Sequence, residues 1–182
     1  MAKTKKEAAK KDAPKKSETE KVETEAVQTE EQDAPMLSVL AQYIKDSSFE
    51  NPSAPESLRS DLSPPEISIN IEIGRQMLEG GVAEVVLMFS AKAERDNKPV
   101  FLCELEYAGL FTFGNVPEEH LLPMIMIECP RLLFPFARQI MADMTQSGGY
   151  PPILLDPPDF AGMFRAEMMR RAAEQGEGAA LN

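Results

Sequence analysis

The sequence has few of the residues from which active sites are commonly built. It contains one histidine, His120, and two cysteines, Cys103 and Cys129, with no CxxC motif and no Cys/His metal-ligand spacing. No GxSxG, Walker or GxGxxG motif occurs, so no nucleotide site is indicated. Both cysteines lie in apolar runs typical of buried thiols, and His120 is typical of a surface residue. We expect no enzyme, cofactor or metal site; an enzyme that uses one of these thiols with His120 is the alternative.

Long apolar runs are also missing. Seven lysines occur within the first 16 residues, but no apolar segment follows them as it would in a signal peptide. No stretch approaches the ~18 consecutive apolar residues that indicate a membrane-spanning helix. The sequence therefore predicts neither secretion nor membrane insertion, and we expect a cytoplasmic protein.

Positive charge is in deficit. The chain has 19 Lys and Arg against 30 Asp and Glu, a formal net charge of −11. A nucleic-acid partner is disfavoured, because binding to phosphates needs a basic surface. The charge favours a partner with a basic face, although a role in solubility alone is also compatible with it.

Composition divides the chain unevenly. Residues 1–35 hold eight Lys, nine Asp or Glu and no aromatic residue, so nearly all of the net charge belongs to the remainder. Such a segment cannot bury enough apolar surface to offset the entropy of ordering. We predict a disordered charged extension over 1–35, one domain over 36–173, and a flexible tail over 174–182.

Period-2 alternation predicts four strands joined in sequence into an antiparallel sheet. The first covers about 37–50 and is followed by a proline-rich loop over 51–65. The second alternates Ile67, Ile69, Ile71 and Ile73 with polar residues. The third begins near Val85, Asp96 and Asn97 form a turn, and the fourth runs over about 100–113 with Gly109 as a candidate bulge.

A helical period follows from residue 118 to 147, with a break or kink expected near Pro130 and Pro135. This helix is apolar around most of its circumference, and a single sheet covers only one side of a helix. Surplus apolar surface should therefore meet another subunit or a ligand. An extended, proline-rich segment over 150–158 leads to a last helix over about 160–173, for which Asp159 is a plausible N-cap.

Two further patterns concern the faces of these elements. Eleven methionines, most of them in the helical half, suit either ordinary packing or a surface that accepts many sequences. In the fourth strand, Phe101, Cys103 and Leu105 share one face, and Leu102, Glu104 and Glu106 share the other. The second set is either an acidic patch with an apolar centre or an ordinary solvated face.

Several motifs resemble the SecB family of protein-export chaperones. They are YIKDSSFENPSAP, ISINIEI, EVVLMFSAKA, FLCELEYAGLFTF, ECPRLLFPFAR and GGYPPILLDPPDFAGMF, in the order of the family and spanning about residues 37–169. The resemblance implies an α+β fold, with a four-stranded antiparallel sheet and both helices packed on one side of it. It also implies a homotetramer built as a dimer of dimers. The long charged extension and the short tail after the last helix depart from the family's pattern.

The resemblance further implies an ATP-independent holdase. Such a protein keeps secretory precursors unfolded in the cytoplasm and delivers them to the SecA translocation ATPase; the alternative is a SecB-like chaperone dedicated to one partner, such as a toxin–antitoxin system. By position, the family's SecA contact maps to Asp46, Glu50, Leu102 and Glu104. The client groove maps to Ile67, Ile69, Ile71, Leu133, Phe136, Ile140, Met144, Tyr150, Leu154 and Phe160.

Overall fold

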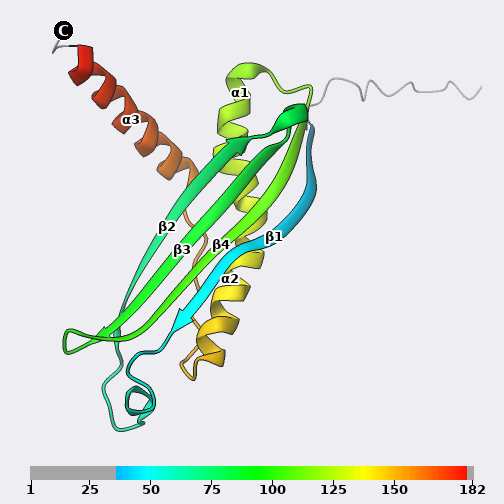
Figure 1. The fold of residues 1–182 in the computed structure, drawn as a ribbon. Helices are drawn as coiled ribbons and strands as arrows, with labels where there is room; N and C mark the ends of the chain where they lie inside the picture. Colours follow the sequence, from blue (N-terminus) through cyan, green and yellow to red (C-terminus); the bar gives the residue numbers. More distant parts are fainter. Residues whose placement is uncertain (1–35, 180–182) are drawn as a thin grey trace, which may run out of the picture. The chain divides into compact units, whose positions relative to one another are not determined.

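The computed structural model describes residues 36–179, which all belong to one of the two units into which the chain divides, 33–182. The disordered extension predicted for 1–35 lies outside the described residues, as does the end of the predicted tail. The described part is an antiparallel sheet with helices, so the predicted α+β class is confirmed (Figure 1).

Four strands form the sheet, as the sequence predicts. They are β1 (Met36–Glu50), β2 (Glu66–Met77), β3 (Ala83–Arg95) and β4 (Lys98–Gly114), in the spatial order β1-β4-β3-β2. The turn between β3 and β4 is Asp96-Asn97, where both residues have positive φ, which these side chains tolerate in two-residue hairpins. Because β1 pairs with β4, the first and second strands lie at opposite edges, and residues 51–65 cross the end of the sheet between them.

The helical half begins with α1 (Glu118–Pro123), continues through a π-helical turn, η3 (Met124–Glu128), and ends with α2 (Cys129–Ser147). The expected irregularity is therefore the π turn just before Pro130. The amide of Cys129 bonds the carbonyl of Met124, five residues back, as π geometry requires. At Pro135, where we also expected a break, α2 continues.

The core lies between α2 and the inner face of the sheet. Leu133, Ala137 and Met141 form a fully buried stripe at the i, i+4, i+8 spacing of one helix face. Residues of β3 and β4 meet this stripe, and their predicted alternation is confirmed: buried there are Val85, Leu87, Phe89, Ala91, Phe101, Cys103 and Leu105. Leu132 and Phe136, on other sides of α2, are exposed.

Within the described residues, the helical run Glu118–Ser147 is long and apolar enough to cross a membrane by length and composition, with a mean hydropathy of 1.2. Its buried stripe packs on the sheet, however, and 39% of this apolar window is buried. The surplus on its other faces is the feature that matters for function.

The last helix, α3 (Phe160–Ala179), ends later than the predicted position near Ala173. Asp159 caps it as predicted, because its Oδ1 accepts a hydrogen bond of 2.9 Å from the amide of Gly162. Only its first turns pack: Phe160 is buried, and Met163 and Phe164 are half-buried against the core. Beyond them α3 extends away from the sheet (Figure 1), so the predicted packing of this helix is limited to its first turns.

Gly109 is paired with Gln42 and Val85 in an unbroken stretch of both ladders, so it is not the expected bulge. The irregularities next to β4 instead fall between Val39 and Ala41, between Ile44 and Asp46, and between Ala93 and Glu94. A Cβ at Gly109 would lie 2.7 Å from Leu133 Cδ2. The glycine therefore lets α2 approach β4 closely.

We predict that Gly109→Ala destabilises the fold by about 1–3 kcal/mol, because the added methyl overpacks the contact between α2 and β4. Gly114→Ala, in the same strand, is the matched control, since its Cβ would meet only Met36 atoms at ordinary distances of 3.5 Å or more. Urea unfolding at one protein concentration measures both. Equal stability of the two variants would contradict the close packing described here.

Candidate functional site

An apolar hollow of about 350 Å³ lies where β2 meets the segment between α2 and α3. We call it the crossover hollow. Its lining combines two proline pairs with aliphatic and aromatic side chains: Pro64, Pro65, Ile67, Ile69, Phe101, Tyr150, Pro151, Pro152, Ile153 and Leu154. The surface is suited to apolar side chains of an extended chain.

Alternation within the extended segment 150–158, which we call the crossover segment, exposes part of this lining. Ile153 and Leu155 are buried, whereas Leu154 between them is 72% exposed, as expected for an extended backbone whose side chains alternate. The amide of Ile153 donates a hydrogen bond of 3.1 Å to Oγ1 of Thr145, a buried residue of α2. This bond ties the crossover segment to the core and holds Leu154 outward.

A second hollow, of about 380 Å³, opens at the end of α2. We call it the helix hollow; its lining is Phe49, Ile140, Asp143, Met144, Ser147 and Gly148. The ring of Phe49 packs directly against the backbone of Gly148. A Cβ at this position would overlap the ring, so only glycine permits this approach.

Three aromatic rings join the two hollows. The centroid of Phe101 lies 5.6 Å from that of Phe49 and 4.7 Å from that of Tyr150. The hydroxyl of Tyr150 donates to Asn51 Oδ1 at 2.9 Å and lies 2.9 Å from Ser57 Oγ, which fixes the ring against the loop 51–65. The two hollows therefore share an ordered aromatic wall.

The strand beside the crossover hollow is an edge of the sheet. Since β2 pairs only with β3 among the described residues, one side of its backbone has no neighbouring strand. Ile67 and Ile69 on this strand are 43% and 44% exposed. An extended segment could therefore add to β2 by backbone hydrogen bonds while its side chains enter the hollow.

The predicted groove residues are distributed unevenly. Ile67, Ile69, Tyr150 and Leu154 line the crossover hollow, and Ile140 and Met144 line the helix hollow. Ile71 lines a further hollow against α3.

The remaining three predicted residues fall outside these hollows. Phe136 is 52% exposed on α2 and stacks on Tyr107, with 6.4 Å between ring centroids. Leu133 and Phe160 are 0% and 2% exposed. These two belong to the core, because they are the points where α2 and α3 pack, and they offer no surface to a client.

Sequence reasoning missed Phe49 and Phe101 as lining residues. Alternation placed Phe101 on the core face, where it is buried, and gave no sign that its ring also reaches a hollow. The available signal was two of the three PP dipeptides, at 64–65 and 151–152, each followed two residues later by an exposed aliphatic residue, Ile67 or Leu154. Both dipeptides border the crossover hollow.

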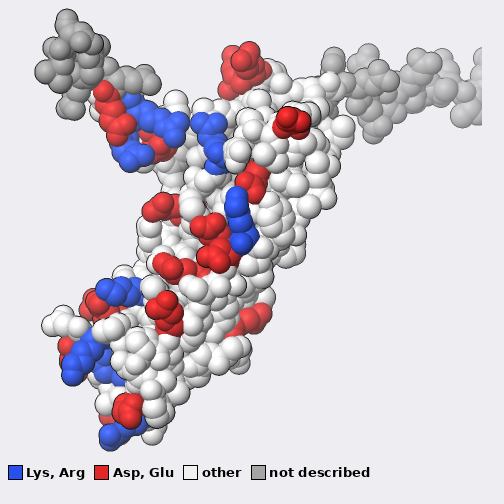
Figure 2. Space-filling model, in the orientation of Figure 1, with Lys and Arg blue, Asp and Glu red and all other residues white. Residues whose placement is uncertain are grey.

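The outer face of the sheet carries carboxylates on three strands. Asp46 of β1 pairs with Glu106 of β4, which pairs on its other side with Met88 of β3, and Glu72 of β2 pairs with Met88 in turn. A shallow hollow of about 200 Å³ lies there, and Glu104 also lines it. Figure 2 shows Asp and Glu side chains gathered over the middle of this face.

The four predicted docking residues lie together on this face. Ser48 pairs with Glu104, and Glu50 pairs with Leu102, in the rungs next to Asp46 and Glu106. Asp46, Glu50 and Glu104 are exposed and Leu102 is half-buried. The β1–β4 pair thus presents an acidic surface with an apolar centre, which we call the acidic patch.

Glu84 is a separate carboxylate farther along the same face. It is 8% exposed, accepts a hydrogen bond of 2.9 Å from Lys45 Nζ, and accepts another from the hydroxyl of Tyr43. These hydrogen bonds, that of Lys45 above all, hold the pKa of Glu84 below its usual value. Because Lys45 compensates its charge, Glu84 ties β1 to β3 and adds little to the acidic patch.

The residues of the alternative enzyme are poorly placed for chemistry. Cys103 and Cys129 are fully buried, and burial raises the pKa of these thiols to about 11 and about 12. Nucleophilic thiols need the opposite, a lowered pKa and an accessible sulfur. His120 is exposed, and its Nε2 lies 3.5 Å from Oε1 of Glu119, its one ion-pair partner among the described residues. Among the described residues no cluster of three metal-ligating side chains occurs.

Comparison with known proteins identifies the family. Residues 30–171 match the family SecB, described as preprotein translocase subunit SecB. A protein-export protein SecB of Bradyrhizobium sp. (strain BTAi1) is 54% identical over 142 residues, 78% of this chain and 88% of that protein. One from Maricaulis maris is 53% identical over 140 residues, 77% of this chain and 81% of that protein.

The fold agrees with a solved structure. A SecB-like chaperone of Mycobacterium tuberculosis, in complex with a ChAD peptide from the HigA1 antitoxin, aligns with a TM-score of 0.55. It is 16% identical and the alignment covers 67% of this chain and 90% of that one, so it supports the fold alone. The family match and the two export relatives go further: this chain belongs to the SecB family of preprotein translocase subunits.

Proposed function

We propose that this protein is a protein-export chaperone that holds secretory precursors unfolded without ATP and delivers them to the SecA translocation ATPase. The observation that carries the proposal is the pair of apolar hollows joined by an aromatic wall, beside an edge strand with exposed isoleucines. Membership of the SecB family supplies the export role. We place the protein in the cytoplasm, where it would meet precursors before export.

Binding follows from the surfaces. An unfolded client exposes apolar side chains and unpaired backbone, and the crossover hollow with the β2 edge can accept both. Burial of one large aliphatic or aromatic side chain contributes about 1.5–3 kcal/mol before ordering costs. Several weak contacts of this kind on one client give avidity without sequence specificity.

Release needs no chemistry by this chain. We propose that a basic surface of SecA binds the acidic patch, with Asp46, Glu50 and Glu104 as charged contacts and Leu102 at the apolar centre. Complementary charge mainly speeds encounter and sets specificity. The resemblance to SecB implies that the part of SecA that meets this patch is a basic zinc-binding tail, whose zinc belongs to SecA.

Further exposed apolar surface lies outside the two client hollows and is available for contacts between subunits. Val39, Leu40 and Ile44 are exposed along β1, the other edge of the sheet, and Leu132 and Phe136 are exposed on α2. We propose that these surfaces join subunits into a homotetramer, a dimer of dimers. A tetramer also multiplies the client sites available to one precursor.

The first test is light scattering of a denatured secretory precursor diluted with and without the protein, with no nucleotide present. We expect the protein to suppress aggregation, and Leu154→Asp to suppress it roughly tenfold less effectively, because the charge enters an apolar contact. Met169→Asp is the control, since Met169 is equally exposed at 72% but lies outside both hollows.

Unchanged aggregation with the wild-type protein would contradict the holdase proposal. Equal loss in the two variants would contradict the assignment of the crossover hollow. Suppression for one specific partner only, with no effect on several unrelated precursors, would favour the dedicated chaperone of a toxin–antitoxin system instead.

The second test separates docking from client binding. We expect Asp46→Lys with Glu104→Lys to abolish binding to SecA and leave client binding unchanged, because both side chains point away from the two hollows, on the outer face. Glu56→Lys with Glu79→Lys is the matched control; it changes the net charge equally at exposed positions elsewhere. Isothermal calorimetry with SecA and anisotropy with an unfolded peptide measure the two events. Joint loss of both would mean that the patch is structural.

A further inference from the structure

Lys45 directly precedes Asp46 of the acidic patch on β1. The register of β1 with β4 shifts between Ile44 and Asp46, which makes Lys45 the extra residue of a β-bulge. In a regular strand, two consecutive side chains point to opposite faces of the sheet. The bulge instead leaves both on the outer face, where Nζ of Lys45 meets Glu84 and Asp46 lines the shallow hollow. A cation able to neutralise the patch is therefore the immediate neighbour of one of its carboxylates.

Glu84 holds this cation away from the patch. Its Oε2 accepts a hydrogen bond of 2.9 Å from Nζ of Lys45, and its side chain is nearly buried. Along β4, the partner of Glu84 is Leu110, four residues beyond Glu106, so the two rungs are roughly 13 Å apart. The ammonium group of Lys45 is therefore drawn along the outer face, away from the rung that Asp46 shares with Glu106.

Lys92 of β3 is a second basic residue on the outer face and is held in a similar way. Its cross-strand partner on β4 is Leu102, the apolar centre of the acidic patch. Its Nζ, however, lies 2.7 Å from Oε1 of Glu94, on the same strand and outside the patch. Both basic side chains next to the patch are thus paired with carboxylates that do not belong to it.

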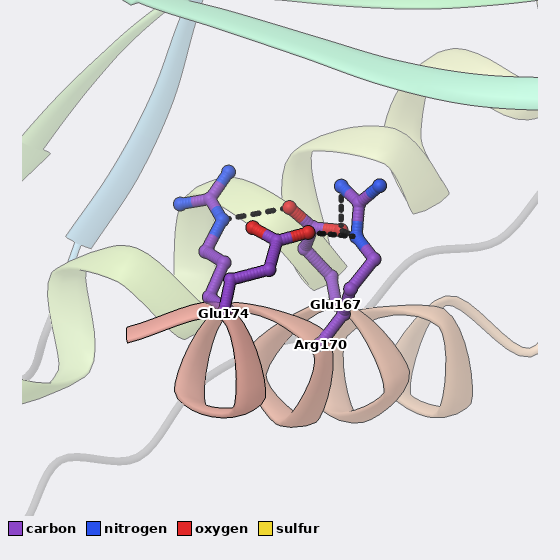
Figure 3. A network of polar contacts seen from close by, with 4 residues as sticks. Glu167, Arg170 and Glu174 are labelled. Carbon is purple, nitrogen blue, oxygen red and sulfur yellow. Dashed lines mark hydrogen bonds and ion pairs between the residues drawn. The ribbon is translucent and has the colours of Figure 1, made fainter. Parts of the chain in front are cut away.

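The basic residues of α3 are also taken up locally. Arg170 and Arg171 both donate hydrogen bonds to Glu167, and Nε of Arg170 lies 4.0 Å from a carboxylate oxygen of Glu174 (Figure 3). Among the described residues, no ion pair involves a carboxylate of the acidic patch. The charge of the patch is therefore left for a partner.

We propose that Glu84 is a positioning residue for docking, which holds Lys45 along the sheet and so keeps the acidic patch available to a basic surface. The inference rests on the proposed docking of SecA at this patch. Without the carboxylate of Glu84, the flexible four-carbon stem of Lys45 would let its ammonium group turn to Asp46 or to Glu106 across the strands. That internal pair would have to break before Asp46 could contact SecA.

A purely structural role of Glu84, as a tie between β1 and β3, makes a different prediction. If only the tie matters, removal of Lys45 in addition to the Glu84 carboxylate leaves the tie broken and docking impaired. If Glu84 acts by holding Lys45, removal of both restores docking, because no cation is then released beside Asp46. The two roles are therefore separated by one double variant.

The test is isothermal calorimetry of the full-length protein with SecA at low salt. We expect Glu84→Gln to bind roughly two- to fivefold more weakly than the wild type, the range that one exposed charge pair allows. High salt should remove most of this difference. Gln keeps the shape of the side chain and can still accept the hydrogen bond from Tyr43. Glu84→Gln with Lys45→Gln should recover the wild-type affinity.

Two variants control for net charge. Glu79→Gln makes the same change as Glu84→Gln at an exposed position away from the patch and should bind like the wild type. Glu84→Gln with Lys98→Gln restores the net charge at another exposed position and should stay as weak as Glu84→Gln.

The proposal is overturned if Glu84→Gln binds as tightly as the wild type, if Lys45→Gln does not rescue it, or if Lys98→Gln rescues it equally well. A changed oligomeric state of Glu84→Gln, measured by light scattering after size-exclusion chromatography, would also overturn it, because Glu84 would then act through the packing of β1. Absence of binding by the wild type would refute the docking surface itself, and this assignment with it.

Discussion

The packing of α2 on one face of a four-stranded sheet is the constraint on which the rest of the structure depends. The stripe of Leu133, Ala137 and Met141 fills that face, and Gly109 allows the helix to approach it closely. A helix that is apolar on more than one side cannot bury all of its apolar side chains against a single sheet. Leu132 and Phe136 are left exposed, and among the described residues each edge strand, β1 and β2, has one side without a neighbouring strand.

Because side chains alternate along the strands, the residues that line the hollows and the residues of the acidic patch lie on opposite faces of the sheet. On β4, Phe101 belongs to the core and the wall of the crossover hollow, while its neighbour Leu102 belongs to the acidic patch on the opposite face. The same division holds at the end of β1, where Phe49 lines the helix hollow and Glu50 lies in the patch. Client holding and partner docking can therefore occupy one small domain without competing for the same side chains.

Local patterns predicted the elements, and tertiary packing decided the sites. The isoleucines of β2, the Asp96-Asn97 turn and the Asp159 cap were predictable because each depends on a few neighbouring residues. Leu133 and Phe160 were misplaced because core and groove positions carry the same kind of side chain. The hollow between β2 and α3 was not predictable, since it brings Arg75 together with Arg170 and Arg171, almost a hundred positions away on α3, and no local pattern reports that proximity.

The central claim is that apolar surface and the β2 edge stay available in the assembled protein and receive unfolded chains. Hydrogen exchange followed by mass spectrometry, with and without a precursor kept unfolded by substitutions in its own core, tests this most directly. The account predicts slower exchange in β2 and in residues 148–159 when the precursor is bound, with β4 unchanged. Protection that is absent from both segments, or that appears only on β1 and α2, would contradict it.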